Sequence, residues 1–501
     1  MNTQIKPHKG LALALGVGAC LFAGTGFDVV YHWNMLIIGA RLSTTVSGII
    51  VAAVFIVAAV AAILAIAVAR AKRLRNGAVG TGLILFIVFF SFPISVVAFF
   101  EQRYIVGEDH LENVSPLYND KAQWESRAAD IRQGILAGAE LDPLPDRTPL
   151  NAVIHGNRTF TNYTVENVFF ESIPGFFVAG NLYRPLLINA STPKPVILLP
   201  HGHFDGGRFA EYCQQLGATF ARMGAIAMTY DMVGYGESLQ VDHGESHVLM
   251  LQLWNSVRVL DFLLTLDGAD STRVGITGAS GGGTQTILLV AIDDRVDASA
   301  PVAMVSASSF GGCTCETGMP IRKGIGHPAS NVEIAALVAP KPLLLVSIGN
   351  DWTKTTPTVE FPFIQRIYGF YDKSSMVTNV HLPTDQHDFS PSKRDAVYRS
   401  FADQFHLAIA NVTLPNGTIN EMANTIESPD AMLAFTQAYP LPSYALQGQQ
   451  AVLDAFTAVQ HGTLHNTTMI PFYAEVIPAV MLMLTGIVMV DYKRSRSVKS
   501  R

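Results

Sequence analysis

Charged side chains are scarce in this chain. Only 15% of its 501 residues are Asp, Glu, Lys or Arg, whereas 49% are hydrophobic. A typical soluble domain has about 25% charged residues, so this shortage excludes a protein that is exposed to water along its whole length. The formal net charge of −6 also lacks the basic excess that nucleic-acid binding requires. We therefore expect no nucleic-acid partner, and we expect contact with a lipid bilayer.

Cysteines are also few. The chain has only four, which is too few for a disulfide-rich scaffold of this length. Cys213 could form a disulfide with Cys313 or with Cys315, which would leave an odd thiol. The Cys-x-Cys spacing at 313–315 could alternatively belong to a metal site, but such a site needs further ligands that the sequence does not identify. We predict neither a metal nor a cofactor.

The hydrophobic residues are concentrated in long runs. Residues 42–69 and 76–100 contain no charged side chain, and both exceed the roughly 20 residues that cross a bilayer. The run 10–27 is either a first span or the hydrophobic part of a signal peptide, and we favour the span. A further transmembrane helix is expected at 470–491. The sequence thus predicts a multi-pass membrane protein.

Basic residues define the topology. They crowd the short link at 70–75 and the tail at 492–501, and Lys6 and Lys9 precede the first run. The positive-inside rule places all three groups in the cytoplasm, so residues 101–470 face the extracellular, lumenal or periplasmic side. Seven N-glycosylation sequons agree, because all of them lie in this part of the chain. They are at Asn113, Asn157, Asn162, Asn189, Asn411, Asn416 and Asn466.

The outer part of the chain alternates between two kinds of pattern, which predicts an α/β fold with a mostly parallel sheet and helices on both faces. Strand-like runs occur at 163–170, 175–183, 195–200, 225–230, 273–277, 299–306 and 342–348. Helical patterns occur at 121–136, 209–223, 247–264, 331–338, 358–372 and 391–409. We divide the chain into a membrane region (1–100), a lead-in (101–150), the α/β domain (151–410), a helical and loop extension (411–469), a span (470–491) and a cytoplasmic tail (492–501).

The sequence Gly-Ala-Ser-Gly-Gly at 278–282 carries most of the functional information. It is a G-x-S-x-G pattern between a strand-like run and a helical one, which is the setting of a nucleophile elbow. Gly278 and Gly282 would let neighbouring backbone approach a sharp turn. Ser280 would then be the nucleophile, and the N–H group of Gly281 would face a developing oxyanion.

A serine nucleophile needs a histidine base and a carboxylate that orients it. Asp351 directly follows the strand-like run 342–348, where ligand-facing groups gather in a parallel sheet. His387 follows in a polar loop, so the order serine, acid, histidine is complete. Glu316 is an alternative acid, because it follows the strand-like run 299–306. Each of these residues taken alone would be an ordinary loop residue.

A second oxyanion donor is expected in the loop after strand 195–200, which reads His201-Gly202-His203. The backbone N–H of His203 is our candidate. A competing interpretation is metal binding, since His201 and His203 would project to one face of an extended chain and His243 and His247 are further candidates. We favour the oxyanion loop, because it already explains the spacing.

With these motifs, residues 140–410 resemble the α/β-hydrolase superfamily, in its acetyl-xylan-esterase-like and dienelactone-hydrolase-like branch. The stretches Asp146–Leu150, Pro174–Pro185 and Tyr230–Ser238 add to the resemblance. It implies a cofactor-free esterase in which Ser280 attacks, His387 transfers the proton and Asp351 orients it. One departure is His203, because many relatives have glycine at that place in the loop.

The resulting hypothesis is a membrane-anchored serine hydrolase that cleaves a small-molecule or carbohydrate ester outside the cytoplasm through an acyl-enzyme. A peptidase of the prolyl-oligopeptidase kind is a first alternative, although such enzymes generally add a β-propeller and no blade-like repeat occurs in this sequence. A catalytically silent receptor or scaffold with the same fold is a second, which the complete set of Ser, Asp and His disfavours.

Overall fold

The computed structural model describes residues 106–186, 191–308, 311–322 and 328–463. The spans predicted at 10–27, 42–69, 76–100 and 470–491 and the basic segments beside them lie outside these residues. Within the described ranges, no helix combines the length and the hydropathy needed to cross a membrane.

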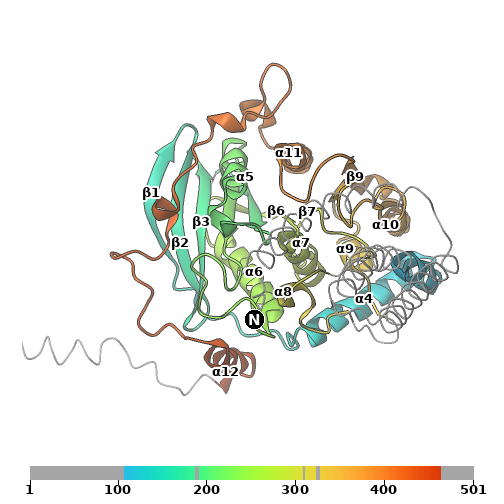
Figure 1. The fold of residues 1–501 in the computed structure, drawn as a ribbon, viewed down its shortest axis with the longest axis horizontal. Helices are drawn as coiled ribbons and strands as arrows, with labels where there is room; N and C mark the ends of the chain where they lie inside the picture. The colour runs from blue at the N-terminus through green and yellow to red at the C-terminus, as the bar shows by residue number, and fades with distance from the viewer. Residues whose placement is uncertain (1–105, 187–190, 309–310, 323–327, 464–501) are drawn as a thin grey trace, which may run out of the picture.

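A nine-stranded sheet forms the centre of the described structure, in the order β1-β2-β3-β5-β4-β6-β7-β8-β9 (Figure 1). β1, β2, β3 and β5 pair antiparallel, and the five pairings from β5–β4 to β8–β9 are parallel. This confirms a mostly parallel sheet. The strands are β1 Val153–Phe160, β2 Tyr163–Ile173, β3 Phe176–Pro185, β4 Lys194–Pro200, β5 Ile226–Tyr230, β6 Ala269–Ala279, β7 Ala298–Val302, β8 Leu343–Ile348 and β9 Val377–Leu382.

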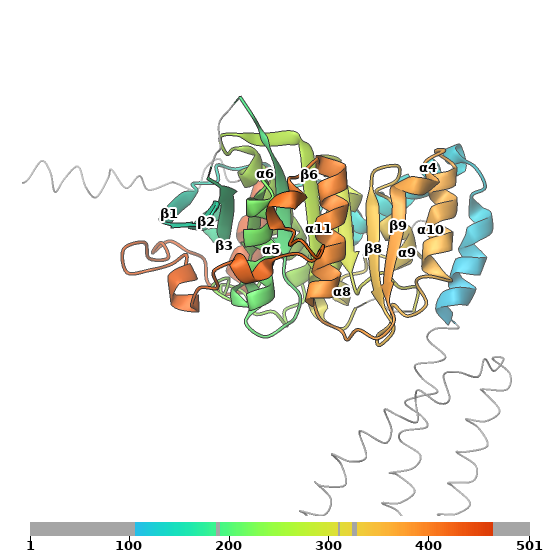
Figure 2. The same ribbon diagram turned by 90° about the horizontal axis from the view of Figure 1, so that it is seen from above.

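Helices cover both faces of the sheet, as the sequence predicts (Figures 1 and 2). α5 and α11 bury their apolar residues against one face, and α4, α6, α7, α9 and α10 form the core on the other. The helices are α4 Lys121–Gly138, α5 Glu211–Arg222, α6 Val248–Leu264, α7 Gly281–Ile292, α8 Thr314–Thr317, α9 Asn331–Ala336, α10 Glu360–Gly369, α11 Pro391–Phe405 and α12 Gln449–Gln460. The helices cover the two faces of the sheet, and loops follow the carboxyl ends of the parallel strands.

The parallel strands at the centre are continuous apolar runs because both of their faces are covered. Every residue of β5, β7 and β8 is buried. α7 is buried along nearly its whole length and carries no charged residue. Two strands were absent from the sequence-based prediction. β1 and β9 are the edges of the sheet and are largely half-exposed or exposed, so they lack an apolar run.

The extension after α11 lies against the antiparallel end of the sheet, where the orange chain crosses β1–β3 (Figure 1). Asn167 Nδ2 on β2 donates to the carbonyl oxygens of Ala431 and Leu433, at 3.1 and 2.8 Å. Asn181 Nδ2 on β3 donates to that of Met432 at 2.9 Å. These buried amides satisfy irregular backbone that would otherwise lose its contact with water. The extension is therefore an integral layer of the described structure.

Candidate active site

The nucleophile turn lies at the centre of the sheet, between β6 and α7. Ser280 is the N-cap residue of α7 and has φ 56° and ψ −120°, a conformation that a residue with a side chain rarely adopts. Its N–H donates to the carbonyl of Val302 at 3.0 Å, and its own carbonyl accepts from Thr284 at 3.0 Å. Such strain persists only where the surroundings impose it. The backbone thus has the form of a nucleophile elbow.

The two outer glycines of the pattern are sterically required. A Cβ atom on Gly278 would lie 2.5 Å from the carbonyl oxygen of Pro200, and one on Gly282 would lie 2.2 Å from the same oxygen. Because the obstacle is the backbone of the last residue of β4, it has little freedom to move. These contacts show why the turn packs closely against the end of β4.

Asp351 and His387 are brought together by the loops that follow β8 and β9. His387 Nδ1 donates to Asp351 Oδ2 at 2.8 Å, and the carboxylate is only 2% exposed. The other oxygen, Oδ1, accepts from both the N–H and the hydroxyl of Thr353, each at 2.6 Å. With its proton on Nδ1, the neutral imidazole keeps a lone pair on Nε2 and can accept a proton there.

Two aromatic rings contact the imidazole of His387. The ring centroid of Trp352 lies 4.4 Å from that of His387, and the ring centroid of Phe204 lies 5.9 Å away. The first turn of α11 also holds the His387 loop, because the fully buried Lys393 contacts Asp388 at 2.6 Å and Asp385 at 3.2 Å. These contacts restrict the orientation of the histidine.

The loop after β4 packs directly on the nucleophile turn. A Cβ atom on Gly202 would lie 2.6 Å from the carbonyl oxygen of Ala279, so only glycine fits there. A Cβ atom on Gly281 would lie 2.5 Å from the imidazole of His203. Since Gly281 is the first residue of α7, its N–H is among those that a helix cannot satisfy internally. The predicted oxyanion donors, Gly281 and His203, are therefore neighbours.

His201 is buried and connects two loops. Its Nδ1 donates to the carbonyl of Gly202 at 2.8 Å, and its Nε2 accepts from the N–H of Met232 at 3.0 Å. Burial lowers the pKa of His201 to about 4, so the ring is neutral at physiological pH. Its role in the described structure is to join the loops after β4 and β5.

The alternative acid, Glu316, lies elsewhere in the site. Its Oε1 accepts from the hydroxyl of Thr284 at 2.7 Å, and its Oε2 accepts from the N–H of Gly312 at 2.9 Å. These bonds connect the loop before α8 to the first turn of α7. The carboxylate of Glu316 thus holds two segments together beside the nucleophile turn. The acid in contact with His387 is Asp351.

A buried arginine supports the loops behind the site. Arg208 is fully buried, its Nε lies 3.0 Å from Asp231 Oδ1, and it also pairs with Glu237. Burial raises the pKa of Asp231 to about 6, although Arg208 opposes the shift. Glu237 in turn accepts from the N–H groups of Ala434 and Phe435 in the extension. One cation therefore ties the loop after β5 to the extension.

The three cysteines of the described residues are free, so neither predicted disulfide forms. The Cys213 thiol is buried on α5 and donates to the carbonyl of Gly207. Cys313 and Cys315 instead lie beside His203 and His243, with all four donor atoms within 4.8 Å of one another. From the sequence, the Cys-x-Cys pair and the four histidines His201, His203, His243 and His247 were two separate metal hypotheses. The two other histidines of that hypothesis, His201 and His247, lie outside the cluster.

Five of the seven predicted glycosylation sites lie within the described residues, at Asn113, Asn157, Asn162, Asn411 and Asn416. All five are exposed, as attachment of a glycan requires. Asn189 and Asn466 lie outside the described residues. Glycosylation itself stays a prediction.

The fold and the site define the class of the protein as an α/β-hydrolase. Among solved structures, Methylesterase BT1017 has 40% sequence identity and a TM-score of 0.65, and the match covers 72% of this chain and 80% of the methylesterase. This chain therefore belongs to the esterases of the α/β-hydrolase superfamily, which confirms the resemblance predicted from the sequence.

Solved structures with lower sequence identity also match parts of this chain. A glucuronoyl esterase from Solibacter usitatus has 16% identity and a TM-score of 0.43, over 57% of this chain and 94% of its own. An acetyl xylan esterase from Paenibacillus sp. R4 has 15% identity and a TM-score of 0.38, over 56% of this chain and 93% of its own. Neither the protein-family profiles nor the curated proteins contain a match to this chain.

Proposed function

We propose that this protein is a serine carboxylesterase that acts on carbohydrate esters through Ser280, His387 and Asp351. The observation that carries this proposal is the 2.8 Å bond between His387 Nδ1 and a nearly inaccessible Asp351. It fixes the tautomer in which Nε2 is the base. The positive φ of Ser280, directly after β6, supports the proposal because a nucleophile elbow has a strained residue between strand and helix.

The reaction follows from these roles. Ser280 Oγ attacks the ester carbonyl carbon while its proton moves to His387 Nε2, and Asp351 stabilises the imidazolium that forms. The N–H groups of Gly281 and His203 would bind the oxyanion, a contribution for which one donor is typically worth about 10²–10³ in turnover. The tetrahedral intermediate then expels the alcohol, which takes the proton from His387. Water hydrolyses the acyl-enzyme by the same steps and restores Ser280.

The similarity to a methylesterase makes methyl esters the first substrate class to test. A methyl ester of a carbohydrate requires a sugar that bears a carboxyl group, whereas an acetyl ester requires only a sugar hydroxyl. The full-length protein should be assayed on methyl esters of sugar acids, on acetylated sugars and on peptide amides. We expect hydrolysis of at least one ester class. Cleavage of the peptides alone would favour the peptidase alternative, and no hydrolysis of any substrate would favour a silent scaffold.

We further propose that the protein is anchored in a membrane by the spans predicted at its two ends, with the described residues on the non-cytoplasmic side. The support is the distribution of basic residues and the exposure of the five described sequon asparagines. Protease protection of sealed vesicles tests this orientation. The described region should be digested from the outer side of the membrane only.

A further inference from the structure

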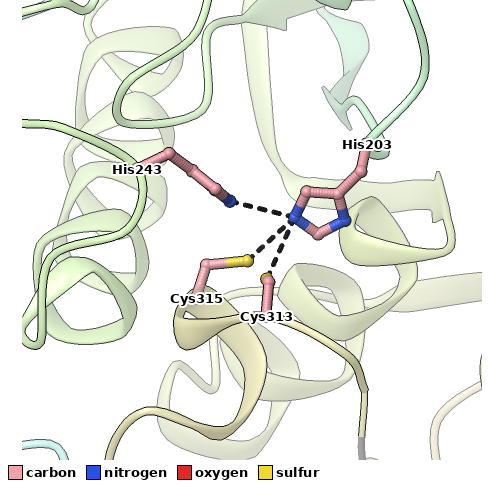
Figure 3. A group of neighbouring side chains, drawn as sticks. All are labelled: His203, His243, Cys313 and Cys315. Carbon is pink, nitrogen blue, oxygen red and sulfur yellow. Dashed lines mark hydrogen bonds between the residues drawn. The ribbon is translucent and has the colours of Figure 1, made fainter. Parts of the chain in front are cut away.

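A cluster of two histidines and two cysteines lies beside the nucleophile turn (Figure 3). Its members come from three loops that follow different strands of the sheet. His203 follows β4, His243 follows β5, and Cys313 and Cys315 lie at the start of α8. The Nε2 atom of His203 lies 3.1 Å from His243 Nε2, 3.0 Å from Cys315 Sγ and 3.1 Å from Cys313 Sγ.

The four donor atoms converge on one point. His243 Nδ1 lies 2.7 Å from the carbonyl of Val233 and must donate its proton there, so the Nε2 of neutral His243 faces the cluster with a lone pair. The two thiols can donate hydrogen bonds, and Cys313 Sγ also lies 3.7 Å from Glu316 Oε2. The feature that points to a metal is the convergence itself, because two imidazole nitrogens and two cysteine sulfurs are the ligand set of a tetrahedral zinc site.

We propose that His203, His243, Cys313 and Cys315 bind one zinc ion. Tetrahedral zinc with Zn–N of about 2.1 Å and Zn–S of about 2.3 Å separates its ligand atoms by about 3.4–3.8 Å. The three contacts of His203 are about 0.3–0.4 Å shorter than the lower end of that range, and all six separations are below 4.8 Å. On binding, each cysteine thiol releases its proton to the solvent and coordinates as thiolate. Thiolate and imidazole together favour zinc over calcium or magnesium.

Hydrogen bonds around the cluster orient its ligands, as is usual for metal sites. The carbonyl of Val233 fixes the ring of His243. The hydroxyl of Thr314, between the two cysteines, donates to the carbonyl of His243 at 2.8 Å. Four protein ligands would complete a tetrahedral shell and leave no position for substrate or water, so the site is structural.

The position of the site suggests what the metal stabilises. The His203 ring packs on Gly281, close enough that a Cβ atom there would lie 2.7 Å from Nδ1. Zinc would therefore hold the loop after β4 against the first turn of α7. This consequence rests on the proposed function, in which Gly281 and His203 supply the oxyanion donors.

Metal analysis of the full-length protein, purified without added metal or chelator, tests the site. We expect equimolar zinc in the wild type, and about tenfold less or lower in Cys315→Ser and His243→Ala. Two variants are matched controls. Cys213→Ser changes a thiol that contacts Gly207 instead, and His247→Ala changes a histidine that contacts Ser246 and Glu140. Both should retain the zinc of the wild type.

Cobalt substitution in the wild type keeps the test valid if the ligand variants do not fold. After zinc is removed with a chelator, added Co²⁺ should give the thiolate-to-cobalt absorption and the intense visible bands of a tetrahedral site. Wild-type protein that contains no zinc and binds neither Zn²⁺ nor Co²⁺ would overturn the proposal. A disulfide between Cys313 and Cys315 in the purified protein, detected by thiol counting and peptide mapping, would overturn it too.

The zinc site and the proposed esterase function can be refuted independently of each other. Ser280→Ala should abolish ester hydrolysis and keep its zinc. Zinc in a protein without esterase activity would refute the proposed function alone. Conversely, an active and metal-free wild type would refute the zinc site alone. Chelation should lower both the unfolding temperature and kcat of the wild type while leaving the unfolding temperature of Cys315→Ser unchanged.

Discussion

Replacement of Asp351 by Asn tests the orientation of the catalytic histidine. Both hydrogens from Thr353 point at Oδ1 in the wild type, so the amide oxygen of Asn should take that position. Its NH₂ group would then face His387 Nδ1, where the wild type has an acceptor at 2.8 Å. Two donors cannot share one bond, and the imidazole should therefore shift its proton to Nε2. In that tautomer it cannot accept the proton of Ser280.

The expected loss is large and specific. Inverting the tautomer of a triad histidine lowers kcat by about 10⁴-fold, which corresponds to about 5 kcal/mol of transition-state stabilisation. The assay is hydrolysis of an aryl acetate by full-length Asp351→Asn, with the unfolding temperature as a check on folding. The shape of the side chain is conserved, so the unfolding temperature should change little.

Glu316→Gln is the matched control, since Glu316 is the alternative acid. Its contacts with Thr284 and Gly312 are hydrogen bonds that an amide oxygen can accept in part. We expect kcat within about tenfold of the wild type, consistent with the loss of about 1 kcal/mol of hydrogen bonding. Loss of activity in Glu316→Gln together with an active Asp351→Asn would refute the assignment of the acid.

Three further changes test the packing around the site. Gly282→Ala should cost about 1–3 kcal/mol of stability and most of the activity, because its Cβ would lie 2.2 Å from backbone; thermal unfolding and ester hydrolysis measure both. Arg208→Met should lower the free energy of unfolding by about 3–5 kcal/mol in urea titrations, because it leaves the fully buried Asp231 unpaired. Lys393→Met should lower stability by about 1–2 kcal/mol at neutral pH. Partial burial raises the pKa of Asp385, but hydrogen bonds from Ser392 and Lys393 outweigh it and hold that pKa below 3.8. The stabilisation is therefore present above pH 3.8 and is lost as the pH falls further, so the difference from the wild type should shrink there.

Each of these changes has an outcome that would contradict the reasoning. Gly244→Ala is the control for Gly282, because no atom lies within 4 Å of its added Cβ and its backbone is not strained. Equal effects of the two substitutions would argue against close packing at the turn. An Arg208→Met protein as stable as the wild type would contradict the buried pair. A stability difference for Lys393→Met that persists unchanged at pH 3 would contradict the linkage to Asp385.

Much of the fold could be predicted from the sequence because the central elements are buried on all sides. The apolar runs at β4, β5 and β8 and the amphipathic pattern of α6 mark their positions within a few residues. The edge strands β1 and β9 could not be found in this way. They have few buried residues and no continuous apolar run, and neighbouring strands rather than local pattern determine their pairing.

The candidate site likewise has one part that the sequence predicts and one part that it does not. Ser280 and Asp351 follow strand-like runs that the sequence marks, and His387 lies in a polar loop farther on, so their order in the chain was informative. The zinc ligands follow three different strands, and no local spacing relates His203, His243 and the cysteines. Only the strand order brings those loops together. A signal was nevertheless present, because histidine stands at 203 where the family resemblance implies glycine, and a Cys-x-Cys pair occurs in the segment after the strand-like run 299–306.

Covalent labelling of the full-length protein with a fluorophosphonate probe tests the central claim most directly. The probe reacts with a serine that an adjacent base activates, and the modified peptide can be identified by mass spectrometry. The account predicts that wild-type protein is labelled at Ser280 and that Ser280→Ala is neither labelled nor able to hydrolyse esters. Unchanged labelling or unchanged ester hydrolysis in Ser280→Ala would contradict it.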